Sequence, residues 1–209
     1  MNSCIRKPAT SQMHCVLSEI LTRTASSSLS MQDQCRFALY GVGPRREQKP
    51  LCIHHIFTRH ARAIPDALAA SHLGTAMTYR QLDEASDRLA LDLIRRGLTA
   101  SRVCLLVQRS LHMLVGIFGI LKSGASYIPL DGGVITDQTL NYVLKDSGTS
   151  LVLCTASFVH RVPEGLEGLP LEKFTSGDPD AHANDESLQR SEGSSCQDEA
   201  YVIYTSGQF

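Results

Sequence analysis

The residues best suited to chemistry lie near the end of the chain, where the apolar run Tyr201-Val-Ile-Tyr204 is followed directly by Thr205, Ser206 and Gly207. A short apolar run of this kind is typical of a buried strand. Parallel sheets bind ligands at the carboxyl ends of their strands. Turns that contain glycine bind anions through inward-pointing amides, and hydroxyls add donors. The pattern predicts that these three residues bind phosphate, but it also fits a strand that ends in an ordinary turn.

Other reactive residues form weaker patterns. His54, His55 and His60 suggest a zinc site, but His55 and His60 are five positions apart, not the four that align two ligands on a helix. No metal ligand is therefore predicted. Ser206 lacks the G-x-S-x-G surroundings of a nucleophilic serine. Lys122 is expected to be solvated rather than catalytic.

Composition excludes several classes of function. The chain of 209 residues has a formal net charge of −1, so it has no long-range attraction to nucleic acid or an anionic membrane. Tryptophan is absent and aromatic residues make up 6%, which leaves little material for stacking bases. The seven cysteines form no CxxC pair, as in a reducing compartment, and no apolar run reaches the ~20 residues that span a bilayer. We expect a cytoplasmic protein.

Alternating helix and strand patterns are expected to position the phosphate-binding residues. Apolar residues at three- and four-residue steps are clearest in the helix at 80–96, and continuous apolar runs indicate buried strands. This order predicts an α/β fold with a mostly parallel sheet and helices on both faces. The expected helices are 53–62, 80–96, 110–122 and 137–145, and the expected strands are 67–71, 76–79, 103–107, 127–130, 151–154 and 201–204.

Punctuation residues divide the chain into two parts. Residues 1–50 are expected to form a linker with one short helix at 13–21, because Gly41 to Pro44 and Lys49-Pro50 interrupt any regular pattern. Residues 51–209 are expected to form the domain. Within it, residues 175–200 carry seven acidic residues against one arginine, which predicts a surface loop.

Three stretches resemble, in the right order, core motifs of adenylate-forming (AMP-binding) enzymes. The sequence MTYRQL at 77–82 resembles the first motif, LKSGASYIPLD at 121–131 resembles the second, and YVIYTSG at 201–207 resembles the start of the phosphate-binding motif. The resemblance covers 53–207 well and 10–50 loosely. The tyrosine and proline of the second motif favour the nonribosomal peptide synthetase branch over the acyl-CoA ligases, and 10–50 resembles a linker between a condensation and an adenylation domain.

This resemblance implies an activity for the complete enzyme. It would activate an amino or other carboxylic acid with Mg-ATP to an acyl-adenylate, for transfer to the phosphopantetheine thiol of a carrier domain. Thr205, Ser206 and Gly207 would hold the β- and γ-phosphates. Condensation and carrier domains would be the neighbouring partners, with neither nucleic acid nor membrane. The motif residues Tyr79, Leu82, Gly124, Tyr127 and Pro129 would be structural.

The chain departs from the family pattern in two places. Asp131 is followed by Gly-Gly-Val-Ile-Thr136 instead of a segment with two prolines, which removes a φ constraint. Gln208 and Phe209 replace the rest of the phosphate loop, so we expect a chain cut off inside this motif and inactive by itself. The alternatives are a non-catalytic remnant that binds a partner through an open sheet edge, and part of an acyl-CoA ligase.

Overall fold

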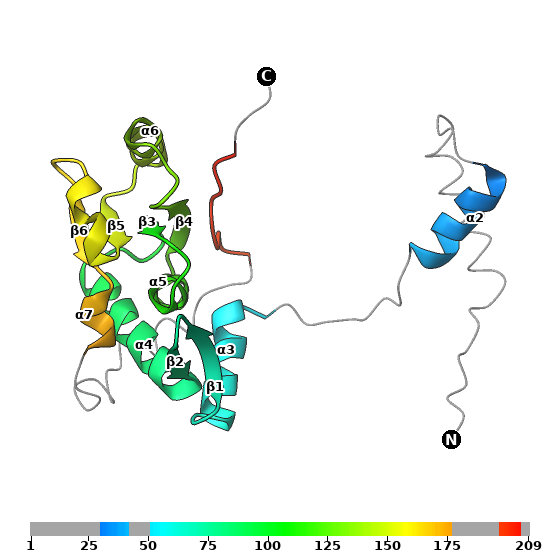
Figure 1. Cartoon of the computed structure of the whole chain (residues 1–209), viewed down its shortest axis with the longest axis horizontal. Coiled ribbons are helices and arrows are strands. Elements are labelled where there is room, and N and C mark those ends of the chain that lie inside the picture. The colour runs from blue at the N-terminus through cyan, green and yellow to red at the C-terminus, as the bar shows by residue number, and fades with distance from the viewer. Residues whose placement is uncertain (1–29, 42–50, 177–196, 206–209) are drawn as a thin grey trace. The chain divides into compact units, whose positions relative to one another are not determined.

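The chain divides into two units, Met1–Lys49 and Pro50–Phe209, which we describe separately. The computed structural model describes residues 30–41, 51–176 and 197–205 (Figure 1). In the first unit, helix α2 spans Met31–Tyr40, and the Ser30 hydroxyl accepts a hydrogen bond from the Asp33 amide at 3.2 Å. The sequence did not predict this helix. The short helix expected at 13–21 lies outside the described residues.

A sheet of four parallel strands forms the centre of the second unit (Figure 1). Its strands are β3 (Arg102–Val107), β4 (Ser126–Asp131), β5 (Leu151–Cys154) and β6 (Glu167–Pro170), in the spatial order β4-β3-β5-β6. Every pairing in this sheet is parallel. The expected parallel α/β fold is therefore confirmed. Strand β6 was missed, because its sequence Glu-Gly-Leu-Pro lacks the β-branched and aromatic residues that mark strands.

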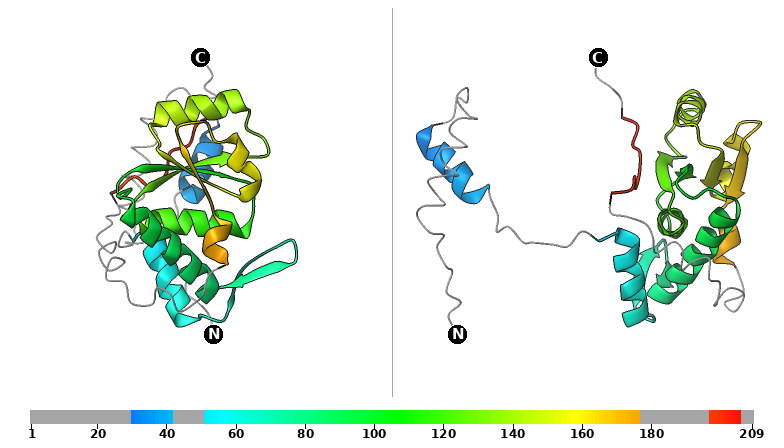
Figure 2. Two further views of the ribbon diagram at one scale, coloured as in Figure 1. Left: turned by 90° about the vertical axis from the view of Figure 1, so that its left-hand side faces the viewer. Right: turned by 180° about the vertical axis from the view of Figure 1, so that it is seen from behind.

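Helices cover both faces of the sheet, as the sequence predicted. Helices α4 (Tyr79–Arg95) and α5 (Leu111–Lys122) lie on one face, and α6 (Asp137–Ser147) lies on the other (Figure 2). Side chains of β3 alternate between the two layers. Leu105 packs in the cluster of α4 and α5, whereas Cys104 and Leu106 pack with α6. Because successive side chains of a strand point to opposite faces, one apolar run supplies both cores.

Local signals in the sequence explain where α4 and α5 begin and how closely they approach. The Thr78 hydroxyl accepts a hydrogen bond from the Gln81 amide and the Gln81 side chain accepts one from the Thr78 amide, which together make a capping box. Ser110 caps α5 through the Met113 amide at 3.3 Å. A Cβ added at Gly119 of α5 would lie 2.5 Å from Cδ2 of Leu89. Glycine at 119 thus allows the close contact between the two helices.

The remaining elements pack beside this layered centre. Helix α3 (Ile53–Ala63) precedes the hairpin of β1 (Leu68–His72) and β2 (Thr75–Thr78), and the 3-10 helix η1 (Ala156–Arg161) and short helix α7 (Glu172–Thr175) flank β6. The buried residues of α3 are His54, Phe57 and Ala61, whereas His60 is exposed.

Two further expectations concern the outside of the molecule. Within the part of the chain that the structure describes, no helix is long and apolar enough to cross a membrane. Most of the acidic stretch expected as a surface loop, residues 177–196, lies outside the described residues. That loop stays a prediction.

Candidate phosphate-binding edge of the sheet

The segment 197–205 runs beside β4 in the parallel direction. Tyr201 forms an isolated bridge with Tyr127. The Tyr127 amide donates to the Ala200 carbonyl at 3.1 Å, and the Val202 amide donates to the Tyr127 carbonyl at 3.0 Å. The expected direction is therefore observed, but a buried strand over 201–204 is wrong in extent and burial. Tyr201 and Ile203 are 52% and 58% exposed, because only one flank of the segment is paired within the described residues.

Polar side chains attach this segment to the sheet. Glu199 accepts two hydrogen bonds at 2.9 Å from the Arg102 guanidinium and one at 2.7 Å from the Ser126 hydroxyl, and these bonds lower the pKa of Glu199. Further along, the Tyr204 hydroxyl donates to Asp146 at 2.7 Å, which raises the pKa of Tyr204 to about 12. Side-chain contacts therefore hold the segment before and after the Tyr201 bridge.

The loop at 131–136 lies at the carboxyl end of β4, and Arg161 holds it. The Arg161 guanidinium donates to the carbonyl of Gly132 at 2.5 Å and to that of Ile135 at 2.6 Å, and it pairs with the Asp137 carboxylate at 2.6 Å. Sequence reasoning expected a loop without its usual proline constraints. The structure shows that contacts from η1 fix this loop instead.

The three residues predicted to bind phosphate stand at the end of this segment and directly after it. Thr205 is its last described residue and is exposed. The segment is parallel to β4 at the bridge of Tyr201 with Tyr127, and its last described backbone hydrogen bond to β4 is the one that the Val202 amide donates to the Tyr127 carbonyl. Ser206 and Gly207 lie outside the described residues. The phosphate site as a group of three residues therefore stays a prediction.

Lys122 is buried, which corrects the expectation that it is solvated. Its residue is 4% exposed, and its Nζ lies 2.6 Å from a carboxylate oxygen of Asp83 and 2.6 Å from one of Asp87. It also donates to the Ser86 hydroxyl at 2.8 Å and lies 5.4 Å from the ring centroid of Phe57. Lys122 thus joins α5 to α4. The sequence contained a signal for this, since the two aspartates stand four positions apart on one helix face.

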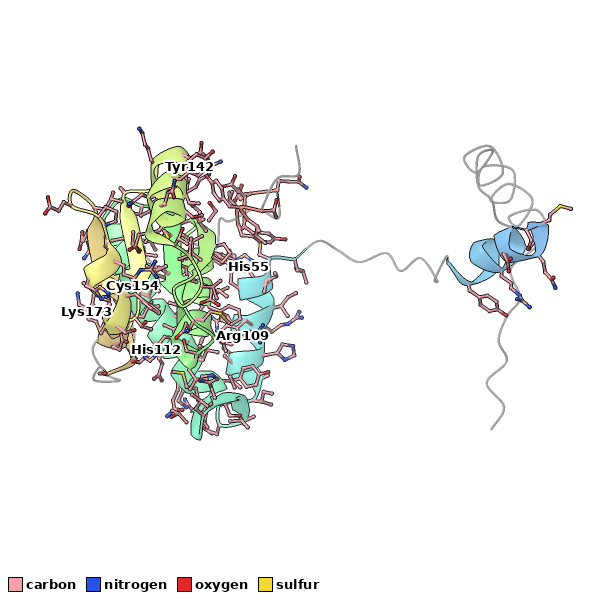
Figure 3. The ribbon with its side chains drawn as sticks, turned by 45° about the horizontal axis from the view of Figure 1, so that its top comes forward. His55, Arg109, His112, Tyr142, Cys154 and Lys173 are labelled. Carbon is pink, nitrogen blue, oxygen red and sulfur yellow. The ribbon has the colours of Figure 1, made fainter. Side chains whose placement is uncertain are left out.

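The histidines of α3 are grouped differently from the pattern considered in the sequence. His60 is exposed, whereas His54 and His55 at the start of the helix lie with Cys52, with ligand atoms within 4.8 Å of one another (Figure 3). Burial is the main cause that lowers the pKa of His54 to about 4, with charges on His55 and Lys122 contributing. Sequence reasoning missed this cluster because it compared only histidines at helical spacing and left out the cysteine before the helix.

The geometry defines the class of protein. A parallel sheet with helices on both faces is typical of nucleotide-binding α/β proteins. Residues 57–207 match the family described as AMP-binding enzyme, and the chain belongs to this family.

Two curated relatives and one solved structure illustrate the family. The chain is 39% identical over 184 residues to adenylate-forming reductase 03009 of Coprinopsis cinerea, a match that covers 87% of this chain and 18% of the reductase. It is 33% identical over 156 residues to gramicidin S synthase 2 of Brevibacillus brevis, covering 74% of this chain and 3% of the synthase. The chain therefore spans a small part of the relatives it matches.

The solved structure shows the same fold. It is the N-terminal subdomain of Klebsiella oxytoca NpsA in complex with 3-hydroxybenzoyl-AMSN, which matches with a TM-score of 0.64 and 21% identity over 79% of this chain and 40% of that chain. The four-stranded parallel sheet and its helices thus correspond to the N-terminal subdomain of the adenylate-forming fold.

Proposed function

We propose that this chain supplies the phosphate-binding part of an adenylation domain in a nonribosomal peptide synthetase. The complete domain activates an amino or carboxylic acid: a carboxylate oxygen bonds to the α-phosphorus of ATP and pyrophosphate leaves. The thiol of a carrier domain's phosphopantetheine then takes the acyl group, and AMP leaves. The family match over residues 57–207 supports this proposal.

The observation that carries the proposal is the direction of segment 197–205. The segment is parallel to β4 at the Tyr201 bridge, and in our proposal its continuation brings the exposed Thr205 to the edge of the sheet where parallel folds bind nucleotides. A hydroxyl and the following glycine suit an anion, because they donate hydrogen bonds without adding bulk. In our proposal Thr205, Ser206 and Gly207 hold the β- and γ-phosphates and stabilise the charge that develops on departing pyrophosphate.

Magnesium would neutralise phosphate charge when bound with ATP. Among the residues that the structure describes, the group of side chains with metal-ligand character is Cys52, His54 and His55. It contains no carboxylate, whereas magnesium prefers oxygen ligands. We therefore assign no magnesium ligand among the described residues.

A chimera tests the proposal. Residues 57–207 of this chain replace the corresponding segment of the Coprinopsis cinerea reductase, and ATP–pyrophosphate exchange is measured with an acid that the unmodified reductase accepts. We expect exchange to be retained. Thr205→Ala in the chimera should lower the rate by about 10²–10³-fold, the usual cost of one oxyanion donor. Thr75→Ala, an exposed threonine of the hairpin, is the matched control.

Two results would contradict the proposal. One is a folded chimera, with the circular dichroism of the parent enzyme, that gives no exchange. The other is a Thr205→Ala chimera that is as active as the Thr75→Ala control.

A second expectation concerns the 209-residue polypeptide assayed alone. We expect no pyrophosphate exchange, because a triphosphate needs a closed set of donors and each missing oxyanion contact costs about 10²–10³ in rate. ATP-dependent exchange by the purified chain, abolished by Thr205→Ala, would overturn this expectation.

The kind of assembly is the finer part of the proposal. The identity of 39% to an adenylate-forming reductase, against 33% to gramicidin S synthase 2, makes a reductase the second candidate. The resemblance of residues 10–50 to a condensation–adenylation linker favours the synthetase. Sequencing the transcript in both directions from this region distinguishes them, since a condensation domain upstream supports the synthetase and a reductase domain downstream supports the alternative.

A partner-binding role without catalysis is favoured by one observation, the exposed Tyr201 and Ile203 beside β4. An unpaired edge with apolar side chains promotes association between chains. Size-exclusion chromatography of the purified chain tests this: a single sharp species that binds a defined partner would support the role, and aggregates would count against it.

A further inference from the structure

Cys52, His54 and His55 gather at the start of helix α3. Cys52 is the N-cap residue, and the two histidines stand in the first turn (Figure 3). One potential ligand atom from each residue lies within 4.8 Å of the other two. The two imidazole rings are 4.3 Å apart between centroids, at an interplanar angle of 67°. Thiolate and imidazole are the donors that zinc-class metals prefer in proteins.

Two buried nitrogens in this cluster lack a hydrogen-bond partner. The Nε2 atoms of His54 and His55 are both buried and make no hydrogen bond within the described part of the chain. His54 as a residue is only 7% exposed. An unsatisfied buried polar atom costs about 1–3 kcal/mol, so proteins usually provide such atoms with a partner. A metal ion bound by both nitrogens would satisfy them together.

The cluster opens into a cavity. The cavity has a volume of about 210 Å³, and its wall includes Cys52, His54, Gly124, Asp198 and Glu199. This space exceeds that of one water molecule, which occupies about 30 Å³. Cys52 and His54 line this space, so a metal held by three protein ligands would keep a coordination position for water or another small ligand, as in zinc sites that are not closed.

We propose that Cys52, His54 and His55 bind a divalent transition metal of the zinc class, with the fourth position open to the cavity. Tetrahedral zinc holds its sulfur and nitrogen ligands about 3.3–3.6 Å from one another, from the usual bond lengths. In the structure the three ligand atoms lie within 4.8 Å of one another. Metal binding would therefore bring them closer together by about 1 Å, and rotation about the side-chain χ angles allows this movement.

The surrounding charges permit a cation. The nearby Lys122 is held by two carboxylates, Asp83 and Asp87, at 2.6 Å each, which offset its positive charge in part. The amides at the start of α3 favour a thiolate at Cys52.

The metal site is distinct from the proposed phosphate site. Gly124 and Ala125, which line the cavity, precede Ser126, the first residue of β4. The cavity therefore lies at the amino end of that strand, and Thr205 is not among the residues that line it. Residues 198–200 also line the cavity, so a bound metal would fix the start of the segment that leads to Thr205.

Metal titration tests the proposal. The 209-residue chain is prepared without a histidine tag, fused to a soluble carrier that contains no cysteine. Zinc binding is measured by competition with a chromophoric chelator, and cobalt replaces zinc as a spectroscopic probe. We expect one equivalent of zinc and a thiolate-to-cobalt charge-transfer band. Cys52→Ser and His55→Ala should each weaken zinc binding by about 100-fold or more, because even changes to groups that only orient a ligand cost about 10–100-fold.

Matched controls use the same residue types at exposed positions. Cys35→Ser and His60→Ala should leave the zinc affinity and the cobalt band unchanged. Far-ultraviolet circular dichroism checks that each variant keeps its fold, and Cys52 and His55 are chosen because they are less buried than His54. Failure to bind zinc would overturn the proposal. So would equal affinity in the Cys52→Ser/His55→Ala double variant, or a cobalt band that persists in Cys52→Ser. Each of these three results would leave the phosphate-site proposal unchanged.

Discussion

Replacement of Lys122 by methionine should destabilise the fold through the charges that it leaves behind. Lys122 is buried between α5 and α4, where Asp83 and Asp87 accept hydrogen bonds from its Nζ. Methionine preserves the apolar length of the side chain but cannot satisfy either carboxylate. The substitution therefore removes the lysine of this ionic cluster and leaves Asp83 and Asp87 in place.

The exposure of the carboxylates sets the expected magnitude. Breaking a fully buried pair costs about 3–5 kcal/mol, whereas exposed pairs contribute under about 1 kcal/mol. The Asp83 side chain is 18% exposed and that of Asp87 is 34% exposed, so solvent screens part of the loss. We expect Lys122→Met to lower the free energy of unfolding by about 2–3 kcal/mol, or to lower Tm by about 4–12 °C for a chain of this size.

The deficit should depend on pH. In the folded protein the pKa of Asp87 is raised, chiefly by burial, with Lys122 opposing the shift. Without Lys122 this pKa rises further. A carboxyl whose folded pKa exceeds its unfolded value takes up a proton on folding, so stability increases as pH falls through the raised pKa. The difference between Lys122→Met and the native chain should therefore be largest near neutral pH and should shrink as pH falls towards the unfolded value of 3.8.

Urea unfolding followed by circular dichroism measures the effect. Lys145→Met, at an exposed lysine of α6, is the control and should change the free energy of unfolding by less than about 0.5 kcal/mol. Asp83→Asn and Asp87→Asn, added together to Lys122→Met, should recover most of the loss. A Lys122→Met variant as stable as the Lys145→Met control would refute the reasoning, as would a deficit that grows at low pH.

Three further substitutions test other parts of the fold. Gly119→Ala should destabilise the chain by about 1–3 kcal/mol, because its Cβ would lie 2.5 Å from Leu89; thermal denaturation measures this, and an unchanged Tm would contradict it. Thr78→Ala removes a capping box and should cost about 1 kcal/mol in the same assay, whereas Thr78→Ser should cost much less. Glu199→Gln should speed hydrogen exchange of the Val202 amide with little change in global stability. Because the pKa of Glu199 is lowered, the protection of the Val202 amide in the native chain should be complete at any pH above the ordinary pKa of a carboxyl. It should weaken as pH falls through the lowered pKa.

Elements with strong local signals could be predicted well. The apolar repeat at 80–96 located α4 to within one residue at each end, and the apolar run at 103–107 located β3. Weak signals failed for physical reasons. The four residues of β6 become a strand only because β5 offers a free edge beside them, and the segment after Tyr201 forms one bridge rather than a ladder.

The candidate site was predictable only in part. The motif at 201–207 predicted the residues and the edge of the sheet, and the structure shows a parallel bridge to β4 at Tyr201. The binding of phosphate by Thr205, Ser206 and Gly207 stays a prediction. The Arg161 contacts that fix the loop after Asp131 join residues more than twenty positions apart, so no local sequence pattern could predict them. The same holds for the cavity that joins Cys52 and His54 to Asp198.

The sequence by itself determined the family, the order of helices and strands, and the parallel α/β class, because these depend on periodicity, capping residues and short motifs that are local in the chain. Only the tertiary structure decided which charges are buried and which side chains meet. Lys122 lies between two aspartates, and Cys52 lies with two histidines, because helix packing brings these groups together. Burial and long-range contact arise from packing over the whole unit, and local sequence does not encode them one residue at a time.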